Sequence, residues 1–214
     1  MLTSILRITL ILLFPFWLHA QLTPTPFIGR GPLFPVNHEE ARDNDLTHVD
    51  NCKNLPEGTI VELRGTILNT SGEAVANAEV LIWQTDDRGI YDHPEAARMM
   101  NLESVELDPH FQYWGKTITD NNGNYYFKTI MPKPYLIANL QRPAHIHFQV
   151  KHPDHKYLTT ELHFPNDKFI EDDPITEELT AEQHKLLMVT ITETPEGLGP
   201  TILGFNMVLK KEQL

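Results

Sequence analysis

The sequence predicts an all-β fold, an antiparallel β-sandwich with long loops and an irregular N-terminal arm. Short segments in which apolar and polar residues alternate recur along the chain, and clusters of turn-forming residues separate them. This is the pattern that the strands of a sandwich produce. The 16 prolines and 11 glycines in 214 residues supply many turns. They also argue against a helical bundle, because both residue types weaken helix interiors.

Residues 1–20 are predicted to be a secretory signal peptide. Arg7 precedes the apolar run Ile8–Leu18, and Ala20 offers a small residue for cleavage. The run is too short to span a bilayer comfortably, and this order of basic, apolar and small residues is typical of export signals. We therefore expect a secreted or periplasmic protein with no stable membrane span after signal removal. An uncleaved anchor is the alternative.

An irregular arm is expected over residues 21–57, which are rich in Pro, Asn and Asp and have no sustained hydrophobic period. Such a segment either wraps the domain or reaches a partner subunit, and the sequence leaves both open. The formal net charge is −12, so no nucleic-acid partner is expected, since nucleic-acid binding needs a basic surface. The only cysteine, Cys52, excludes an internal disulfide.

Residues 58–214 are expected to form one domain that begins with two strands. Apolar residues alternate over Thr59–Leu68, and a second strand pattern, Ala78–Gln84, follows a cluster of turn residues. The next stretch, from Asp86 to Phe111, has no strand pattern. A loop of this length inside a compact domain is usually functional.

The rest of the domain is predicted to contain a hairpin, four further strands and one helix. A turn at Asp120–Gly123 separates the two strands of the hairpin. Thr180 and Gln183 have the spacing of a capping box, which predicts a short helix over residues 181–187. The strands are expected at Lys116–Thr119, Tyr125–Ile130, His145–Lys151, Thr159–Phe164, Leu187–Thr192 and Thr201–Leu209.

The strand that begins at His145 carries a His-x-His pair. Because side chains alternate along a strand, His145, His147 and Gln149 share one face. The opposite face is apolar and is assigned to the core; it consists of Ile146, Phe148 and Val150. Two adjacent imidazoles suit a metal site, although a hydrogen-bonded structural pair explains them equally well. No third histidine or thiolate stands at a familiar zinc spacing.

A wider pattern resembles the intradiol ring-cleavage dioxygenases, and within them the protocatechuate 3,4-dioxygenase type. The resemblance extends from about Gly58 to Leu209. Its specific part is the order and spacing of a Tyr after Gly-x, a Tyr after Pro-x-Pro and the His-x-His pair. The segments that carry it are Gly65–Ile67, Trp83–Asp86, Gly89–Tyr91, Asp108–Phe111, Thr119–Ile130, Pro132–Tyr135 and Arg142–Phe148.

The resemblance implies an iron(III) cofactor bound by four residues. Ferric iron is a hard Lewis acid that suits phenolate oxygen, and a bound cation favours the deprotonated tyrosine. The implied reaction opens a catechol-type ring with O₂ to a cis,cis-muconate-type product, so residues 58–214 would be a catalytic domain and 86–111 one of its active-site loops. The implied ligands are Tyr91, Tyr135, His145 and His147.

Further roles also follow from the resemblance alone. Tyr135 is implied to be the ligand that leaves when substrate binds, Arg142 to stabilise negative charge on the ring, and Gln149 to be a polar neighbour of the metal ligands. The chain departs from the protocatechuate enzymes at Leu136–Asn139, which lacks a tryptophan, and at Glu161, where Gln is common. Both departures argue against protocatechuate as the substrate. A homo- or hetero-oligomer is left open.

Two other functions are compatible with parts of the sequence. A transthyretin-like or adhesin-like binding module would share the opening strands and the Gly123–Phe127 segment, but has no need for two tyrosines with a His-x-His pair. A zinc or iron(II) hydrolase or oxygenase would use His145 and His147 with a carboxylate. It would not need Tyr91 or Tyr135.

Overall fold

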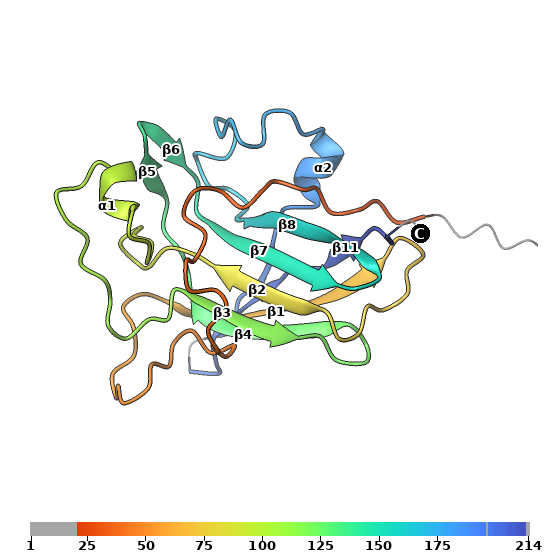
Figure 1. The fold of residues 1–214 in the computed structure, drawn as a ribbon, viewed down its shortest axis with the longest axis horizontal. Helices are drawn as coiled ribbons and strands as arrows, with labels where there is room; N and C mark the ends of the chain where they lie inside the picture. The colour runs from red at the N-terminus through yellow and green to blue at the C-terminus, as the bar shows by residue number, and fades with distance from the viewer. Residues whose placement is uncertain (1–20, 196, 213–214) are drawn as a thin grey trace, which may run out of the picture.

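The computed structural model describes residues 21–195 and 197–212, and this part of the chain folds mainly into strands (Figure 1). The all-β prediction is confirmed. The signal peptide predicted over residues 1–20 lies outside the described residues. In chain order the elements are β1 (Ile60–Asn69), β2 (Glu79–Trp83), α1 (Ala96–Met99), β3 (Trp114–Ile118), β4 (Asn124–Ile130), β5 (Tyr135–Ile137), β6 (Leu140–Arg142), β7 (His145–His152), β8 (His155–His163), α2 (Ala181–Lys185), β9 (Thr190–Thr192), β10 (Thr201–Gly204) and β11 (Met207–Leu209).

Two sheets form the sandwich. The first, which we call the β7 sheet, has the order β3-β2-β7-β8 and is antiparallel throughout. The second, the β1 sheet, has β4 antiparallel to one edge of β1, and β10 and then β11 parallel to the other edge. Parallel neighbours need a long crossover connection, and the chain between β4 and β10, which includes the β7–β8 pair and α2, supplies it (Figure 1).

The core lies between the two sheets. The apolar face of β7 is fully buried there, as its alternation predicts, with Ile146, Phe148 and Val150 all at 0% exposure. From the β1 sheet, Leu63 of β1 and Phe127 of β4 belong to the same cluster of buried side chains. The opposite face of β7, which carries the histidines, points away from this core. It is therefore free to build a site of its own.

The predicted hairpin between Lys116–Thr119 and Tyr125–Ile130 is wrong, although both strands exist. β3 pairs with β2 in one sheet, and β4 pairs with β1 in the other. The turn itself forms, because the amide of Gly123 donates to the carbonyl of Asp120 at 2.9 Å. Turn residues determine where the chain reverses. They do not determine which strands the two flanking segments bond to, because that depends on the tertiary structure. Here the turn carries the chain from one sheet to the other.

The segment predicted as one strand from Thr201 to Leu209 is interrupted after β10. At the break the amide of Phe205 donates to the carbonyl of Arg64 at 2.9 Å. The side-chain oxygen of Asn206 accepts from the amide of Thr66 at 2.9 Å, so it replaces a backbone carbonyl of the ladder. The interruption therefore leaves no β1 amide unpaired at this point.

The helix predicted over residues 181–187 is confirmed as α2. The capping box is present, since the amide of Gln183 donates to Thr180 Oγ1 at 3.2 Å and the amide of Thr180 donates to Gln183 Oε1 at 2.9 Å. Within the described ranges, no helix is long and apolar enough to cross a membrane.

Residues 21–57 run over the surface of the sandwich without a helix or a strand in their described structure. The amide of Thr25 donates to the carbonyl of Val208, and that of Ile28 to the carbonyl of Thr159. Further on, the amide of Leu46 donates to the carbonyl of Lys128 at 2.8 Å. The arm therefore wraps the domain, which was one of the two expectations for it.

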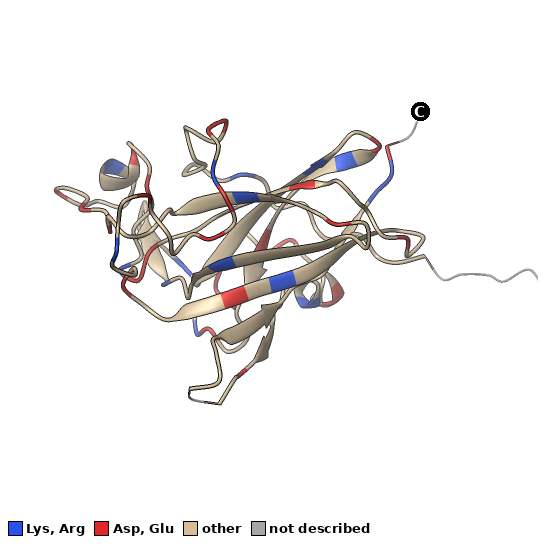
Figure 2. Ribbon diagram, turned by 90° about the horizontal axis from the view of Figure 1, so that it is seen from below, with Lys and Arg blue, Asp and Glu red and all other residues tan. Residues whose placement is uncertain are grey.

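Charged side chains are interspersed over strands and loops (Figure 2). Some pair across neighbouring segments, as Lys151 with Glu79 at 3.5 Å and Lys128 with Asp45 at 3.3 Å. These pairs are solvent-exposed or half-buried, so each contributes little to stability.

Candidate metal centre

The two histidines of β7 bring their Nε2 atoms to within 3.1 Å of each other. Both side chains are buried, with exposures of 2% for His145 and 4% for His147. The indole of Trp83, directly across from His147 on β2, stacks on the imidazole with a centroid distance of 4.5 Å and an interplanar angle of 4°. The predicted common face of the pair is therefore confirmed, and stacking fixes the plane of one ring.

Two tyrosines from outside the β7 sheet reach the same point. Tyr91 lies in the long loop after β2, and Tyr135 opens β5. Each phenol oxygen lies 3.4 Å from His145 Nε2, and both tyrosines are buried. The structure thus brings together all four residues that the resemblance singled out as ligands.

The loop that carries Tyr91 is packed tightly against the segment before Tyr135. Gly89 has φ +78°, a conformation that favours glycine, and a Cβ there would lie 2.8 Å from the carbonyl oxygen of Pro134. The carboxylate of Asp86 accepts from the amides of Arg88 and Ile90 and so holds the turn. Backbone contact between the two segments therefore sets the spacing of the tyrosines.

The protonation of His145 shows that the two Nε2 atoms and the two phenol oxygens fit a cation. Its Nδ1 lies 2.7 Å from the carbonyl oxygen of Pro143, which only accepts, so Nδ1 carries the ring proton. In the neutral imidazole, Nε2 then presents a lone pair to His147 Nε2 and to two phenol oxygens. Two ring nitrogens and two oxygens of this kind form a donor set suited to iron, and metal-bound histidine typically donates its other nitrogen to a carbonyl in this way.

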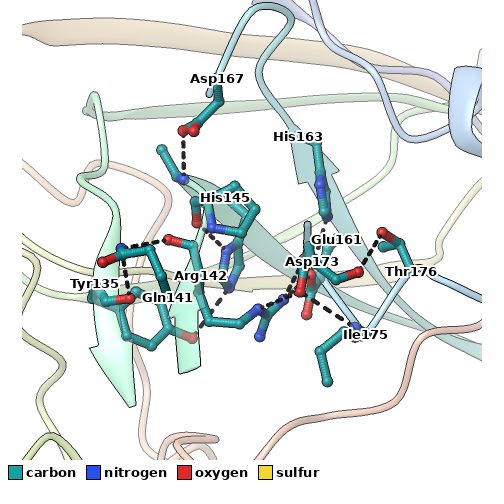
Figure 3. A network of polar contacts seen from close by, with 12 residues as sticks. Tyr135, Gln141, Arg142, His145, Glu161, His163, Asp167, Asp173, Ile175 and Thr176 are labelled. Carbon is teal, nitrogen blue, oxygen red and sulfur yellow. Dashed lines mark hydrogen bonds and ion pairs between the residues drawn. The ribbon is translucent and has the colours of Figure 1, made fainter. Parts of the chain in front are cut away.

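A buried network of charged residues adjoins the four rings (Figure 3). The Arg142 guanidinium, at 5% exposure, donates from Nε to Asp173 Oδ1 at 3.0 Å and from Nη2 to Glu161 Oε2 at 2.7 Å. His163 Nε2 lies 3.0 Å from the same Glu161 oxygen. Arg142 is thus a buried cation between two carboxylates, close to the tyrosine with which it pairs in the β5–β6 hairpin, Tyr135.

Asp173 had not been singled out by sequence reasoning. It lies in an irregular segment between β8 and α2 and belongs to no recognisable motif. Its side chain is fully buried, and it holds Arg142 through two of its atoms. A buried partner of this kind carries no periodic signal, so only the tertiary structure reveals it.

Gln149 shares the face of the two histidines, as predicted, but its amide points elsewhere. Its Nε2 donates to the hydroxyl of Tyr157 at 2.6 Å. The polar neighbour of His147 is instead Glu161, which lies directly opposite on β8 with Oε1 3.4 Å from Nδ1. These contacts connect Glu161, rather than Gln149, to the ring cluster.

Two groups of buried residues have the composition of a metal site within the described residues: His145, His147 and Glu161, and separately Glu161, His163 and Asp173. In the second group the Arg142 guanidinium already bonds to both carboxylates. In the first, Glu161 faces the Nδ1 side of His147, whereas the phenol oxygens gather at the Nε2 atoms. The two-histidine, two-tyrosine set is therefore better arranged than a two-histidine, one-carboxylate set.

The N-terminal arm covers part of the cluster, a contribution that the sequence did not indicate. A Cβ on Gly31 would lie 3.6 Å from His147 Cε1, and Gly31 itself has φ +65°. Phe34 packs edge-on against Trp83 at 4.9 Å, and Leu33 is buried in the same apolar cluster as Tyr91. The arm thus shields the cluster from water on this side.

Burial sets the protonation states of the rings. It raises the pKa of Tyr135 to about 12, partly offset by Arg142, and raises that of Tyr91 well above its ordinary value. Burial also lowers the pKa of His147 to about 4 and that of His145 well below its ordinary value. At neutral pH the metal-free imidazoles are therefore uncharged and can act as ligands, and the phenols must lose their protons to a cation.

The metal-free protein is expected to lose stability as the pH falls from 6.5 towards 4. The folded-state pKa of His147, about 4, lies below its unfolded value of about 6.5, so in this window the unfolded chain binds more protons. This group alone would contribute up to about 1.4 kcal/mol per pH unit. Urea unfolding at pH 7 and pH 5 measures the loss. A His147→Gln variant should show a smaller one, and an equal loss in both proteins would contradict the assignment.

Comparison with known proteins gives one family. A family model described as "Dioxygenase" matches residues 30–211. Among relatives, the chlorocatechol 1,2-dioxygenase of Pseudomonas putida is 28% identical over 170 residues, which are 71% of this chain and 56% of that protein. The protocatechuate 3,4-dioxygenase beta chain of Burkholderia cepacia is 33% identical over 155 residues, 70% of this chain and 61% of that one. The chain thus spans little more than half the length of these relatives.

Solved structures share the fold. The chain is similar to 3-chlorocatechol 1,2-dioxygenase from Rhodococcus opacus 1CP, with a TM-score of 0.67 at 20% identity, covering 91% of this chain and 74% of that one. It is also similar to the dioxygenase domain of a dioxygenase carbohydrate-binding protein fusion from Streptomyces sp. SirexAA-E. That similarity has a TM-score of 0.63 at 22% identity and covers 88% of this chain and 99% of that domain.

Proposed function

Since the chain belongs to the intradiol ring-cleavage dioxygenase family, we propose that it opens the ring of a catechol-type substrate with O₂ at a ferric centre. The product would be a cis,cis-muconate-type acid. The observation that carries the proposal is the convergence of two phenol oxygens on His145 Nε2, which faces His147 Nε2 inside a buried cluster. A binding module has no use for such a set.

Tyr91, Tyr135, His145 and His147 would hold the ferric ion. A bound ferric ion supplies Lewis acidity and a template for the two catechol oxygens. Two phenolates suit its high charge better than thiolates or neutral donors do. The carbonyl of Pro143, which fixes the proton of His145 on Nδ1, keeps the Nε2 lone pair available for the ion.

Tyr135 is proposed to take part in proton transfer during substrate binding. Its phenol opens β5 next to Arg142, its partner in the β5–β6 hairpin, and the family resemblance implies that this is the exchangeable one of the two phenols. A catechol hydroxyl must give up its proton to bind a ferric ion, and the Tyr135 phenolate oxygen would accept that proton. Tyr91, on the loop packed against Pro134, would keep its place.

Arg142 is proposed to stabilise negative charge that develops on the substrate ring. Its ion pairs to Asp173 and Glu161 use Nε and Nη2 and fix the plane of the guanidinium. Nη1, which those ion pairs do not use, would face the substrate. A preorganised cation in a dry site stabilises developing charge without reorganising during the reaction.

Catechol-type compounds are the substrate class that the relatives share by name, since those names include chlorocatechol, catechol and hydroxyquinol 1,2-dioxygenases. On the strength of the predicted signal peptide, we also propose that the protein is exported to the periplasm or the medium. We further propose that it assembles into a homo- or hetero-oligomer.

The visible spectrum of the iron-loaded chain tests the proposed function. We expect iron equimolar with protein, a tyrosinate-to-iron(III) charge-transfer band, and a shift of this band when catechol is added without O₂. Admission of O₂ should then yield a ring-opened muconate. Tyr91→Phe should weaken the band, whereas Tyr126→Phe on β4, whose side chain is not in the cluster, should leave it intact. A protein that stays colourless after ferric reconstitution would refute the proposal.

A further inference from the structure

Glu161 is buried between the ligand histidines and the charged network. It lies directly opposite His147 on the neighbouring strand and is 2% exposed. One carboxylate oxygen, Oε1, faces His147 Nδ1 at 3.4 Å. The other, Oε2, accepts from Arg142 at 2.7 Å and contacts His163 Nε2 at 3.0 Å. Arg142 and His163 therefore hold the carboxylate through Oε2 (Figure 3), and Oε1 is left facing His147.

His147 needs a partner that decides which ring nitrogen carries its proton. Its Nδ1 is buried and makes no hydrogen bond to any described residue, and Glu161 is the carboxylate that faces it. A carboxylate accepts but does not donate when ionised, so it favours the proton on Nδ1 and leaves the Nε2 lone pair for a metal. The carbonyl of Pro143 plays the corresponding part for His145.

The network also brings two buried carboxylates to one guanidinium. Arg142 supplies one positive charge, and Glu161 and Asp173 supply one negative charge each, all of them buried. Charges interact strongly where water is excluded. A negative charge next to an iron ligand stabilises the ferric ion more than the ferrous ion, because the ferric ion has the higher charge.

We propose that Glu161 is a positioning residue that orients His147 towards the metal and stabilises the ferric state of the bound iron. The proposal rests on the proposed function, because it requires iron at the four-ring cluster. It goes further because it assigns the orientation of His147, and an effect on the iron potential, to a carboxylate that does not itself bind the metal. Carboxylates next to other metal-bound histidines act in this way.

The midpoint potential of the iron in Glu161→Gln tests this proposal. The substitution keeps the shape of the side chain and removes its charge. In the iron-loaded full chain we expect the ratio of ferric to ferrous affinity to fall at least tenfold, which raises the one-electron potential by about 59 mV. Asp173→Asn is the matched control, because it also removes one charge beside Arg142 but does not contact His147. Its shift should be clearly smaller.

The possible outcomes separate this proposal from the proposed function. If the wild-type protein shows the tyrosinate band but Glu161→Gln has the wild-type potential, the role of Glu161 is refuted and the dioxygenase function stands. A shift in Asp173→Asn as large as that in Glu161→Gln would refute the contact with His147 as its cause. Wild-type protein that binds no ferric iron would refute both proposals.

If the Glu161→Gln variant does not fold, a second measurement on the wild-type protein still tests the proposal. In the metal-free wild-type protein, nitrogen NMR of the histidine rings reports the tautomer of His147. We expect the ring proton on Nδ1, because Glu161 Oε1 faces that nitrogen in a buried site. A His147 ring proton on Nε2 would refute the proposal.

Discussion

A His145→Gln variant of the full chain is expected to lose its iron and its ring-cleaving activity while keeping its fold. His145 Nε2 is the atom around which the cluster is arranged, 3.1 Å from His147 Nε2 and 3.4 Å from each phenol oxygen. Glutamine replaces the imidazole with a primary amide, whose nitrogen only donates hydrogen bonds and offers no lone pair to a metal. Loss of a residue that only contacts a metal ligand already lowers metal affinity by about 10- to 100-fold. Loss of a ligand itself should therefore lower iron affinity by at least about 100-fold.

Iron content and visible absorption after ferric loading measure this effect. His152→Gln is the control, since His152 lies at the far end of the same strand and contacts His155 rather than the cluster. It should retain iron and colour. A His145→Gln protein with full iron content and an unchanged band would show that the metal binds elsewhere, and both the site and the function proposed for it would then have to be abandoned.

A Gly65→Ala substitution is expected to destabilise the fold by at least about 3 kcal/mol, the upper part of the range for overpacking. A Cβ on Gly65 would lie 1.8 Å from the carbonyl oxygen of Phe205 and 2.7 Å from the hydroxyl of Tyr125. That hydroxyl donates to the same carbonyl. The new methyl group must therefore displace backbone where β10 ends, and separate a buried donor from its acceptor.

Urea unfolding of the metal-free protein measures the Gly65→Ala effect without interference from iron. Gly204→Ala is a close control, because Gly204 pairs with Arg64 in the adjoining register, and a Cβ there would meet its nearest atoms at 3.6 Å. Its stability should stay within about 1 kcal/mol of wild type, since alanine suits a strand better than glycine. Equal stabilities for the two variants would mean that the break after β10 is more adaptable than its packing indicates.

Local patterns in the sequence predicted much of this molecule correctly. The two-residue alternation on β7 separated a core face from a histidine face, and the Thr180–Gln183 spacing predicted the capping box of α2. Position in a known motif, rather than composition, distinguished Tyr91 and Tyr135 from the other tyrosines. The structure brings these two together with the histidine pair.

Most of the errors and omissions concern partners that are distant in the chain. The turn at Asp120–Gly123 predicted a hairpin, but its two strands bond to β1 and β2 in different sheets. Asp173, the buried partner of Arg142, and Gly31, which lies against His147, have no sequence signal of their own. Gln149 shares the face of the histidines and donates to Tyr157, and the carboxylate of Glu161, which comes from the neighbouring strand, faces His147.

The sequence by itself determined most of the strands, which faces are apolar and which side chains could bind a metal, because these properties depend on spacings of a few residues. Only the tertiary structure decided which strand edges bond, how the arm covers the rings, and which carboxylates neutralise Arg142. Strand pairing depends on the closure of long loops, and the partners of Arg142 depend on which charges are buried together. A hydrophobic period of a few residues carries no information about either property.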